Sequence, residues 1–237
     1  MMETQRITVI TGANRGLGRA VSLAAAHRGD HVVAVGRTVG GLEELDDAIK
    51  ELGGTCTLVP LDLTDRDGVN RLGASLFERF GRVDGLFANA AILGPLMPLS
   101  DYPADKFFDV INTNLLAVHD LYRSLYLPLK QSEQGRVLFV SSGVAQNPRS
   151  YWGAYAISKA AIENYASIAA MECQQLNIKV NVIDPGALRT GMRAQAMPGE
   201  DPNSLRPPEV LCPPILSLLG DDCAHHGACV SLRSFGL

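Results

Sequence analysis

Short apolar runs alternate along the chain with longer segments in which apolar residues recur every three to four positions. The short runs are rich in β-branched residues and predict strands at residues 6–10, 31–35, 56–60, 84–88, 136–141, 179–183 and 228–232. Between two of them, Leu42, Leu45 and Ile49 follow the spacing of one buried helix face. Such alternation is typical of an α/β fold, in which helices cover both faces of a parallel sheet.

Two longer helices are predicted at residues 105–129 and 152–176, and a shorter one near 209–219. Apolar residues are spread around more than one face of the two long helices. We therefore expect the sheet to cover one side and a second copy of the chain, in a homodimer or homotetramer, to cover another. Residues 185–208 are rich in proline and are predicted to form a lid over the substrate, within one domain that spans residues 1–237.

Composition narrows the class of protein. The 237 residues are 46% hydrophobic and 19% charged, as in a compact soluble domain. The net charge of -4, with both signs interspersed, disfavours nucleic acid as a partner. No run approaches the ~18 apolar residues of a membrane span, and the first residues lack the apolar core of a signal peptide, so we expect a cytoplasmic protein.

The five cysteines show no paired spacing that would indicate a disulfide framework, and buried thiols are the simpler interpretation. Cys223, His225, His226 and Cys229 lie close enough in sequence to suggest a metal clip. A single cluster without a second ligand pair is weak evidence for such a site, and we expect no metal.

A glycine-rich turn joins the first predicted strand to the first helix. It contains Gly12, Asn14, Arg15, Gly16, Leu17 and Gly18. Glycines let the backbone approach a diphosphate closely, and the free N–H groups at a helix start favour its negative charge. The context of the turn, between a strand and a helix, predicts a nucleotide-binding site.

Later motifs extend this prediction. Asp62-Leu63 follows the third strand, Asn89 the fourth, Ser142 the fifth and Pro185-Gly186 the sixth, while Asn114 lies in a helix and Tyr155 and Lys159 form Tyr-x-x-x-Lys. With the spacing G-x-x-x-G-x-G in the turn, the chain resembles the short-chain dehydrogenase/reductase family. The resemblance implies a doubly wound, seven-stranded parallel Rossmann sheet. It also implies hydride transfer between a nicotinamide cofactor and a carbonyl or secondary alcohol.

Tyr155 and Lys159 are four residues apart, so a helix places both side chains on one face. An ammonium group near a phenol favours the phenolate and lowers a pKa that is ordinarily about 10. The resemblance makes Tyr155 the general acid or base and has Ser142 orient the substrate oxygen, with Lys159 also on the nicotinamide ribose. The resemblance also implies that Asn114 holds a water molecule that links Lys159 to bulk solvent. Alternatively, Ser142 is only a helix cap, and Asn114 bonds its own helix backbone.

The second strand ends in Gly36-Arg37, where NAD-dependent relatives usually have an aspartate. Arg37, assisted by Arg15, can pair with a 2'-phosphate, which favours NADP over NAD, although both arginines could also be solvated surface groups. The resemblance implies that Asp62 bonds the adenine, that Asn89 anchors the chain beside the ribose, and that Thr190 contacts the nicotinamide carboxamide. These three could also be ordinary turn residues.

Two features depart from the family pattern. Ala91 replaces the usual glycine of Asn-Ala-Gly, and the end of the chain, Ser231-Leu232-Arg233-Ser234-Phe235-Gly236-Leu237, lacks the usual Asp-Gly-Gly. The second departure puts the family's tetramer contacts in doubt.

The substrate is less well indicated. Apolar residues such as Ile92, Leu93, Trp152, Met192 and Met197 suit a hydrophobic carbonyl, whereas Arg149, Arg189 and Arg193 keep an anionic 3-oxoacyl substrate open. A nucleotide-binding regulatory protein without significant turnover is the alternative function. The complete Ser-Tyr-Lys set favours the enzyme.

Overall fold

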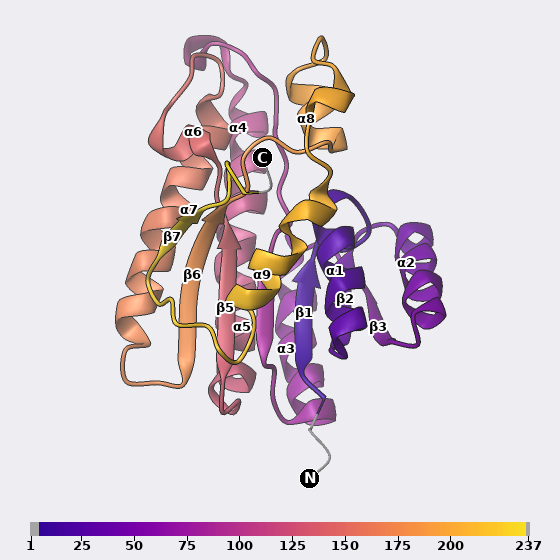
Figure 1. Ribbon diagram of the computed structural model, residues 1–237. Coiled ribbons are helices and arrows are strands. Elements are labelled where there is room, and N and C mark those ends of the chain that lie inside the picture. Colours follow the sequence, from indigo (N-terminus) through magenta and orange to yellow (C-terminus); the bar gives the residue numbers. More distant parts are fainter. Residues whose placement is uncertain (1–4, 236–237) are drawn as a thin grey trace.

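The computed structural model describes residues 5–235 and is built around one parallel sheet (Figure 1). Within the described residues the sheet has seven strands in the order β3-β2-β1-β4-β5-β6-β7, and every neighbouring pair is parallel. The strands are β1 (Ile7–Thr11), β2 (His31–Gly36), β3 (Thr55–Pro60), β4 (Gly85–Ala88), β5 (Gly135–Val140), β6 (Ile178–Asp184) and β7 (Cys229–Ser231). The predicted doubly wound sheet is confirmed.

Helices cover both faces of the sheet. One face packs on α3 (Arg66–Phe80), α5 (Ala117–Lys130) and α7 (Gly153–Glu172). The other packs on α1 (Gly16–Arg28), α2 (Val39–Glu51) and α9 (Cys212–Leu218). The remaining helices are α4 (Ala104–Ile111), α6 (Gly143–Gln146), α8 (Gly191–Ala196), the π-helix η2 (Asn112–Leu116) and the 3₁₀ turns η1 (Leu99–Asp101), η3 (Pro202–Ser204) and η4 (Pro208–Leu211).

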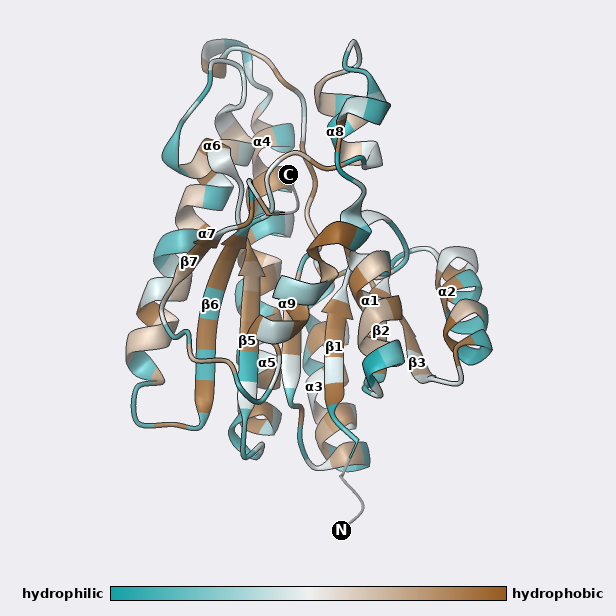
Figure 2. Ribbon diagram, in the orientation of Figure 1, coloured by the Kyte–Doolittle hydropathy of each residue, from teal (hydrophilic) through white to brown (hydrophobic). Residues whose placement is uncertain are grey.

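Alternation along each strand divides the apolar side chains between two cores. Phe139 of β5 joins the core under α3, α5 and α7, whereas its neighbour Leu138 joins the core under α1, α2 and α9. Every residue of β1, β2, β4 and β5 is buried, which explains why these strands read as continuous apolar runs. Figure 2 shows the same distribution, with hydrophobic strands at the centre and hydrophilic residues on the outer faces of the helices.

Several predicted elements differ in detail from the observed ones. The helix expected near 209–219 is the 3₁₀ turn η4 followed by α9. The helix expected at residues 105–129 is α4 and α5 joined through the π-helix at Asn112–Leu116, a local irregularity that apolar periodicity does not reveal. The helix expected at 152–176 ends at Glu172, and the strand expected at 228–232 covers only Cys229–Ser231. Gly236 and Leu237, at the end of the atypical terminus, lie outside the described residues.

The proline-rich segment at residues 185–208 lies beyond the carboxyl ends of the strands, where α8 projects at the top of Figure 1. Its two ends are tied together, because the Arg189 N–H donates to the Arg206 carbonyl at 2.8 Å. Opening of this segment as a lid stays a prediction. So does the single-domain organisation, which the sheet shared by residues 7–231 supports. Across residues 5–235, no helix combines the length and apolar character that crossing a membrane requires.

Candidate active site

The glycine-rich turn between β1 and α1 requires its glycines. Gly12 and Gly16 have φ angles of 63° and 51°, in the region that disfavours side chains. A Cβ on Gly18 would lie 2.1 Å from the Gly12 carbonyl oxygen, so Gly18 supports the turn from beneath. The first residue before α1, Arg15, makes no side-chain cap, which leaves the N–H groups of the helix start available to an anion.

A cleft of about 890 Å³ runs along the carboxyl edge of the sheet, starting at this turn. It brings together most of the site residues predicted from the sequence. These residues come from the segments that follow β1 to β6 and from α7. Its lining includes Gly12, Asn14, Arg15, Gly16, Leu17, Arg37, Asp62, Leu63, Asn89, Ser142, Tyr155, Lys159, Pro185, Gly186 and Thr190. Gly18 and Asn114 are not in the lining, since they support it from behind.

At one end of the cleft, Asn14 leaves little room for a side chain at Gly36, the last residue of β2. A Cβ on Gly36 would lie 3.3 Å from the side-chain oxygen of Asn14, which packs over Gly36 and Gly41. Arg37 and Asp62 face each other across the end of the cleft, with Nη1 and Oδ2 3.8 Å apart. Burial would raise the pKa of Asp62, but hydrogen bonds from Thr64 and the charge of Arg37 lower it overall. With Arg15 also in the lining, this end presents two guanidinium groups and one carboxylate.

Tyr155 and Lys159 lie at the other end, on the inner face of α7, and both are buried. The Lys159 ammonium donates to the Val140 carbonyl at 2.7 Å, and its Nζ lies 5.7 Å from the centre of the Tyr155 ring. Burial lowers the pKa of Lys159 to about 8. Burial also raises the pKa of Tyr155 to about 12, opposed by the nearby Ser142 hydroxyl and reinforced by the charge of Asp184. The sequence-based expectation that Lys159 lowers the Tyr155 pKa is therefore wrong for this structure, in which burial raises it.

Ser142 lies two residues after the end of β5, in a segment that Glu163 of α7 holds on both sides of Ser142. Sequence reasoning missed Glu163. The Ser141 hydroxyl donates to Glu163 Oε1 at 2.6 Å, and Gln146 Nε2 donates to Oε2 at 3.2 Å. Glu163 lies one helical turn beyond Lys159, so the helical spacing that relates Tyr155 to Lys159 could have revealed it. It therefore anchors the segment that carries Ser142 to the helix that carries Tyr155.

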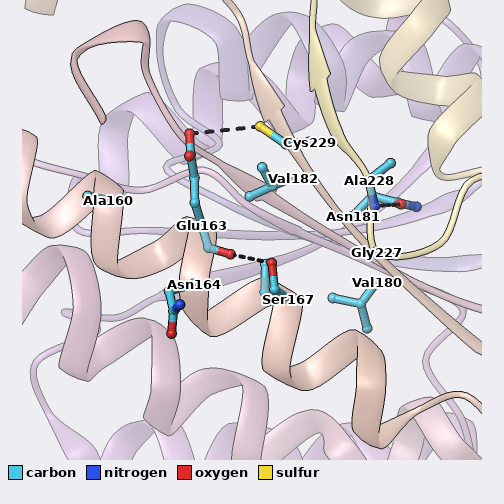
Figure 3. A pocket seen from close by; sticks show the side chains of 11 residues that line it. Ala160, Glu163, Asn164, Ser167, Val180, Asn181, Val182, Gly227, Ala228 and Cys229 are labelled. Carbon is cyan, nitrogen blue, oxygen red and sulfur yellow. Dashed lines mark hydrogen bonds between the residues drawn. The ribbon is translucent and has the colours of Figure 1, made fainter. Parts of the chain in front are cut away.

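The outer side of Glu163 faces a smaller hollow of about 310 Å³ between α7, β6 and β7 (Figure 3). There the Cys229 thiol lies 3.8 Å from Glu163 Oε1, and the Ser167 hydroxyl donates to the Glu163 carbonyl at 3.0 Å. The carboxylate thus contacts β7 as well as the end of β5.

Asn114 and Asn89 join loops rather than capping their own segments. Asn114 lies in the π-helix, accepts a hydrogen bond from the Ile92 N–H at 2.8 Å, and donates to the Ile92 carbonyl and the Ser158 hydroxyl. The alternative in which its side chain bonds its own helix backbone is wrong. Asn89 Nδ2 donates to the Thr11 carbonyl at 2.9 Å, which links the loops after β1 and β4.

Thr190 and the predicted anion-binding arginines also have structural partners. Thr190 caps α8 by accepting a hydrogen bond from the Arg193 N–H at 3.3 Å. Arg193 forms a two-point ion pair with Glu200, which reduces its capacity for a substrate anion. Arg149 lines the cleft, and Arg189 does not.

The cysteines and the histidine cluster show no metal site within residues 5–235. His226 instead joins two elements: its Nε2 donates to the Ala170 carbonyl at 3.0 Å, and its Nδ1 accepts from the Val180 N–H at 3.3 Å. All five thiols are free, and Cys229 is exposed rather than buried.

Comparison with known proteins identifies the family. The family model for short chain dehydrogenases matches residues 6–201. The chain belongs to the short-chain dehydrogenase family. It is 36% identical to the uncharacterized oxidoreductase YciK of Escherichia coli (strain K12), a match that covers 92% of this chain and 87% of the relative.

Two solved structures extend the comparison. A short chain dehydrogenase from Shigella flexneri 2a complexed with NADP has a TM-score of 0.93 and 35% identity, with 96% of this chain and 97% of that chain covered. One from Escherichia coli CFT073 complexed with NADPH has a TM-score of 0.91 and 35% identity, with 96% of each chain covered.

The burial of Lys159 generates a stability prediction for Lys159→Met. The folded pKa of about 8 lies below the ordinary value of 10.5, so below pH 8 folding must transfer a charged ammonium out of water. This penalty is about 3 kcal/mol, and the substitution removes it. The substitution also removes the hydrogen bond to Val140, which costs about 1 kcal/mol of stability. We expect the variant to be more stable by about 1–2 kcal/mol at pH 7, measured by urea unfolding.

The pH dependence tests the cause. The penalty decreases between pH 8 and pH 10.5, as the folded lysine loses its proton before the unfolded one, so the advantage of the variant should decrease over this range. A variant less stable than the parent at pH 7, or an advantage independent of pH, would contradict the assignment.

Proposed function

We propose that the protein is an NADP(H)-dependent oxidoreductase that transfers a hydride between the nicotinamide and a carbonyl or secondary alcohol. The observation that carries the proposal is one cleft with the glycine turn and Arg37 at one end and Ser142, Tyr155 and Lys159 at the other. The NADP and NADPH named for two related structures support the choice of cofactor.

The residues of the cleft fit such a cofactor. The turn has little room for a Cβ at Gly12 and none at Gly18, and the start of α1 presents free N–H groups, as a diphosphate requires. In the proposed assignment Arg37 and Arg15 bind the 2'-phosphate, Asp62 and Leu63 the adenine, and Asn89 the adjacent ribose. The nicotinamide end is assigned to Tyr155, Lys159, Pro185, Gly186 and Thr190, and the bound cofactor supplies or accepts the hydride.

The side chains of the site then manage the proton. In the direction of reduction, the Ser142 hydroxyl donates a hydrogen bond to the substrate oxygen, and Tyr155 donates the proton that this oxygen takes up. The Lys159 ammonium stabilises the resulting phenolate. With a pKa of about 8, Lys159 can also pass on a proton near neutral pH, through a water held at Asn114.

The substrate end favours a hydrophobic carbonyl. Tyr155 belongs to an apolar cluster that contains Leu93, Val144, Ala156 and Ala196, with Leu96, Trp152 and Met192 packed against it. Arg193, one of the candidates for a substrate anion, is paired with Glu200. A panel of aldehydes, ketones, quinones and 3-oxoacyl thioesters, followed through NADPH consumption, tests this preference.

Tyr155→Phe tests the catalytic assignment. The substitution removes the proton donor but keeps the ring in its apolar cluster. General acid-base catalysis contributes about 10² to 10⁴ in rate, so kcat should fall by that factor while the Kd for NADPH changes little. Comparable turnover would reject Tyr155 as the acid. Complete inactivity of the parent protein across the panel would favour the regulatory alternative.

Arg37→Asp tests the cofactor preference. One hydrogen bond to a charged group contributes roughly 1.5–3 kcal/mol, and Arg37 is 61% exposed, which favours the lower end. We expect the parent to bind NADPH about tenfold more tightly than NADH, and the variant to reverse this order, by nicotinamide fluorescence titration. Equal or tighter NADH binding by the parent would show that Arg37 does not read the phosphate.

We also propose that the protein forms a homodimer or homotetramer through the helices around α7. Exposed apolar side chains gather there, on α4, η2, α5 and α7: Phe108, Leu116, Leu127, Ile157, Ile168 and Met171. Light scattering should report an oligomer at micromolar concentration, and Ile168→Glu should weaken it. Leu52→Glu, on an exposed apolar residue after α2, is the matched control. A monomeric parent would refute the proposal.

A further inference from the structure

Arg233, in the atypical segment after β7, forms an ion pair with Asp184 at the end of β6. Its Nε donates to Asp184 Oδ2, and Asp184 Oδ1 accepts from the Gly186 N–H at 3.0 Å. The Asp184 side chain is 7% exposed, whereas that of Arg233 is 45% exposed. A nearly buried carboxylate therefore has its charge balanced by a residue from the end of the chain.

Arg206 fixes the backbone that carries Arg233. Its Nη1 donates to the carbonyls of Leu232 and Phe235, and its Nη2 donates to the Pro185 carbonyl at 3.2 Å. The residues on both sides of Arg233 are thus joined to the loop after β6. The position of the guanidinium group follows from this anchoring.

The guanidinium group also packs against the segment that carries Ser142. A Cβ on Gly143 would lie 1.8 Å from Arg233 Nη2, so the absence of a side chain at Gly143 makes room for it. Arg233 lines the same cleft as Ser142 and Tyr155. It therefore contacts both Asp184 and the backbone beside Ser142.

The charge of Asp184 reaches Tyr155, whose pKa it raises in addition to the larger effect of burial. The other ionisable or charged groups in this environment are Lys159 on the same helix, Arg206 on the Pro185 carbonyl, Glu163 beside Ser141 and Cys229, and Arg149 and the paired Arg193 in the cleft. Of these groups, Arg233 is the one in direct contact with Asp184. Its removal would leave Asp184, whose charge reaches the Tyr155 phenol, without its ion-pair partner.

We propose that Arg233 is a positioning residue for the tyrosine, an inference that rests on the proposed function. It balances the negative charge of Asp184, which would otherwise oppose the negative charge that forms on Tyr155 when the proton leaves. Arg233 acts through Asp184 and does not touch the substrate oxygen. The contact at Gly143 also keeps the backbone of the Ser142 segment in place.

The ionisation of Tyr155 is the direct test. We would measure it in the complex with NADP⁺, by the pH dependence of the ¹³Cζ signal of labelled tyrosine, with Tyr155→Phe identifying the resonance. Arg233→Gln should raise the midpoint by about one pH unit, equivalent to about tenfold less phenolate at a given pH. For any substrate that is turned over, the pH profile of kcat should shift in the same direction while KM changes little.

Two further variants separate charge from structure. In Asp184→Asn/Arg233→Gln both charges are absent, while the amide oxygen can still accept the Gly186 N–H, so the midpoint should return to within a few tenths of the parent value. Arg82→Gln is the matched control, because Arg82 pairs with the equally buried Asp84 at the opposite edge of the sheet, with Nε and Oδ1 3.0 Å apart. It should leave the midpoint unchanged.

An unchanged midpoint in Arg233→Gln, or a double variant that fails to restore it, would overturn the inference. If Arg233→Gln does not fold, Asp184→Asn decides, since the inference requires its midpoint to lie at or below that of the parent. The titration needs no substrate. A shift in a protein that reduces no compound of the panel supports the inference and favours the regulatory alternative. Turnover without the shift supports the proposed function and overturns the inference.

Discussion

The hydrogen bond from the Lys159 ammonium to the Val140 carbonyl sets the geometry of the end of the cleft that holds Tyr155 and Ser142. It ties the middle of α7 to the last residue of β5, and so fixes Tyr155, one turn earlier on the helix, beside Ser142, which follows the strand. This hydrogen bond requires that the Lys159 ammonium be buried, and burial of a charge opposes folding. Burial of apolar side chains in the two cores on either side of the sheet offsets this penalty. The buried charge at this site thus lowers the free energy of unfolding of a fold that is otherwise well packed.

The order of the strands determines where the cleft opens. β1 lies between β2 and β4, so the chain leaves β1 toward one side of the sheet and later returns to the other. The loops after β1 and β4 therefore diverge at this point, where ligands bind in open parallel sheets. Asn89 joins the two loops through Thr11, and a Cβ on Gly12 would lie 3.0 Å from the Asn89 side chain. Asn89 therefore packs directly against the glycine turn, and a side chain at Gly12 would displace it.

Sequence patterns predict the parts of this molecule that depend on neighbours along the chain. The buried strands, the glycine turn and the pair Tyr155 and Lys159 all have local spacing, and the structure places the predicted cleft residues together. The missed features join distant positions: Ser141 and Glu163 are 22 residues apart, and Asp184 and Arg233 are 49 apart. The π-helix at Asn112–Leu116 was not predicted because the spacing of its apolar residues resembles that of an α-helix. The raised pKa of Tyr155 also could not be predicted from spacing, since it results mainly from burial.

The atypical end of the chain shows how a departure from a family pattern can be accommodated. The sequence lacks Asp-Gly-Gly after the last strand, and a cation occupies this region instead, paired with the aspartate that ends β6. Because Arg206 anchors the same segment to Pro185, the residues after β7 are joined to a loop that lines the cleft together with Tyr155. A cation inserted near Tyr155 without a partner would have attracted the phenolate, and an aspartate without one would have repelled it. Together the two residues preserve charge balance, so neither can be changed alone without consequence for the tyrosine.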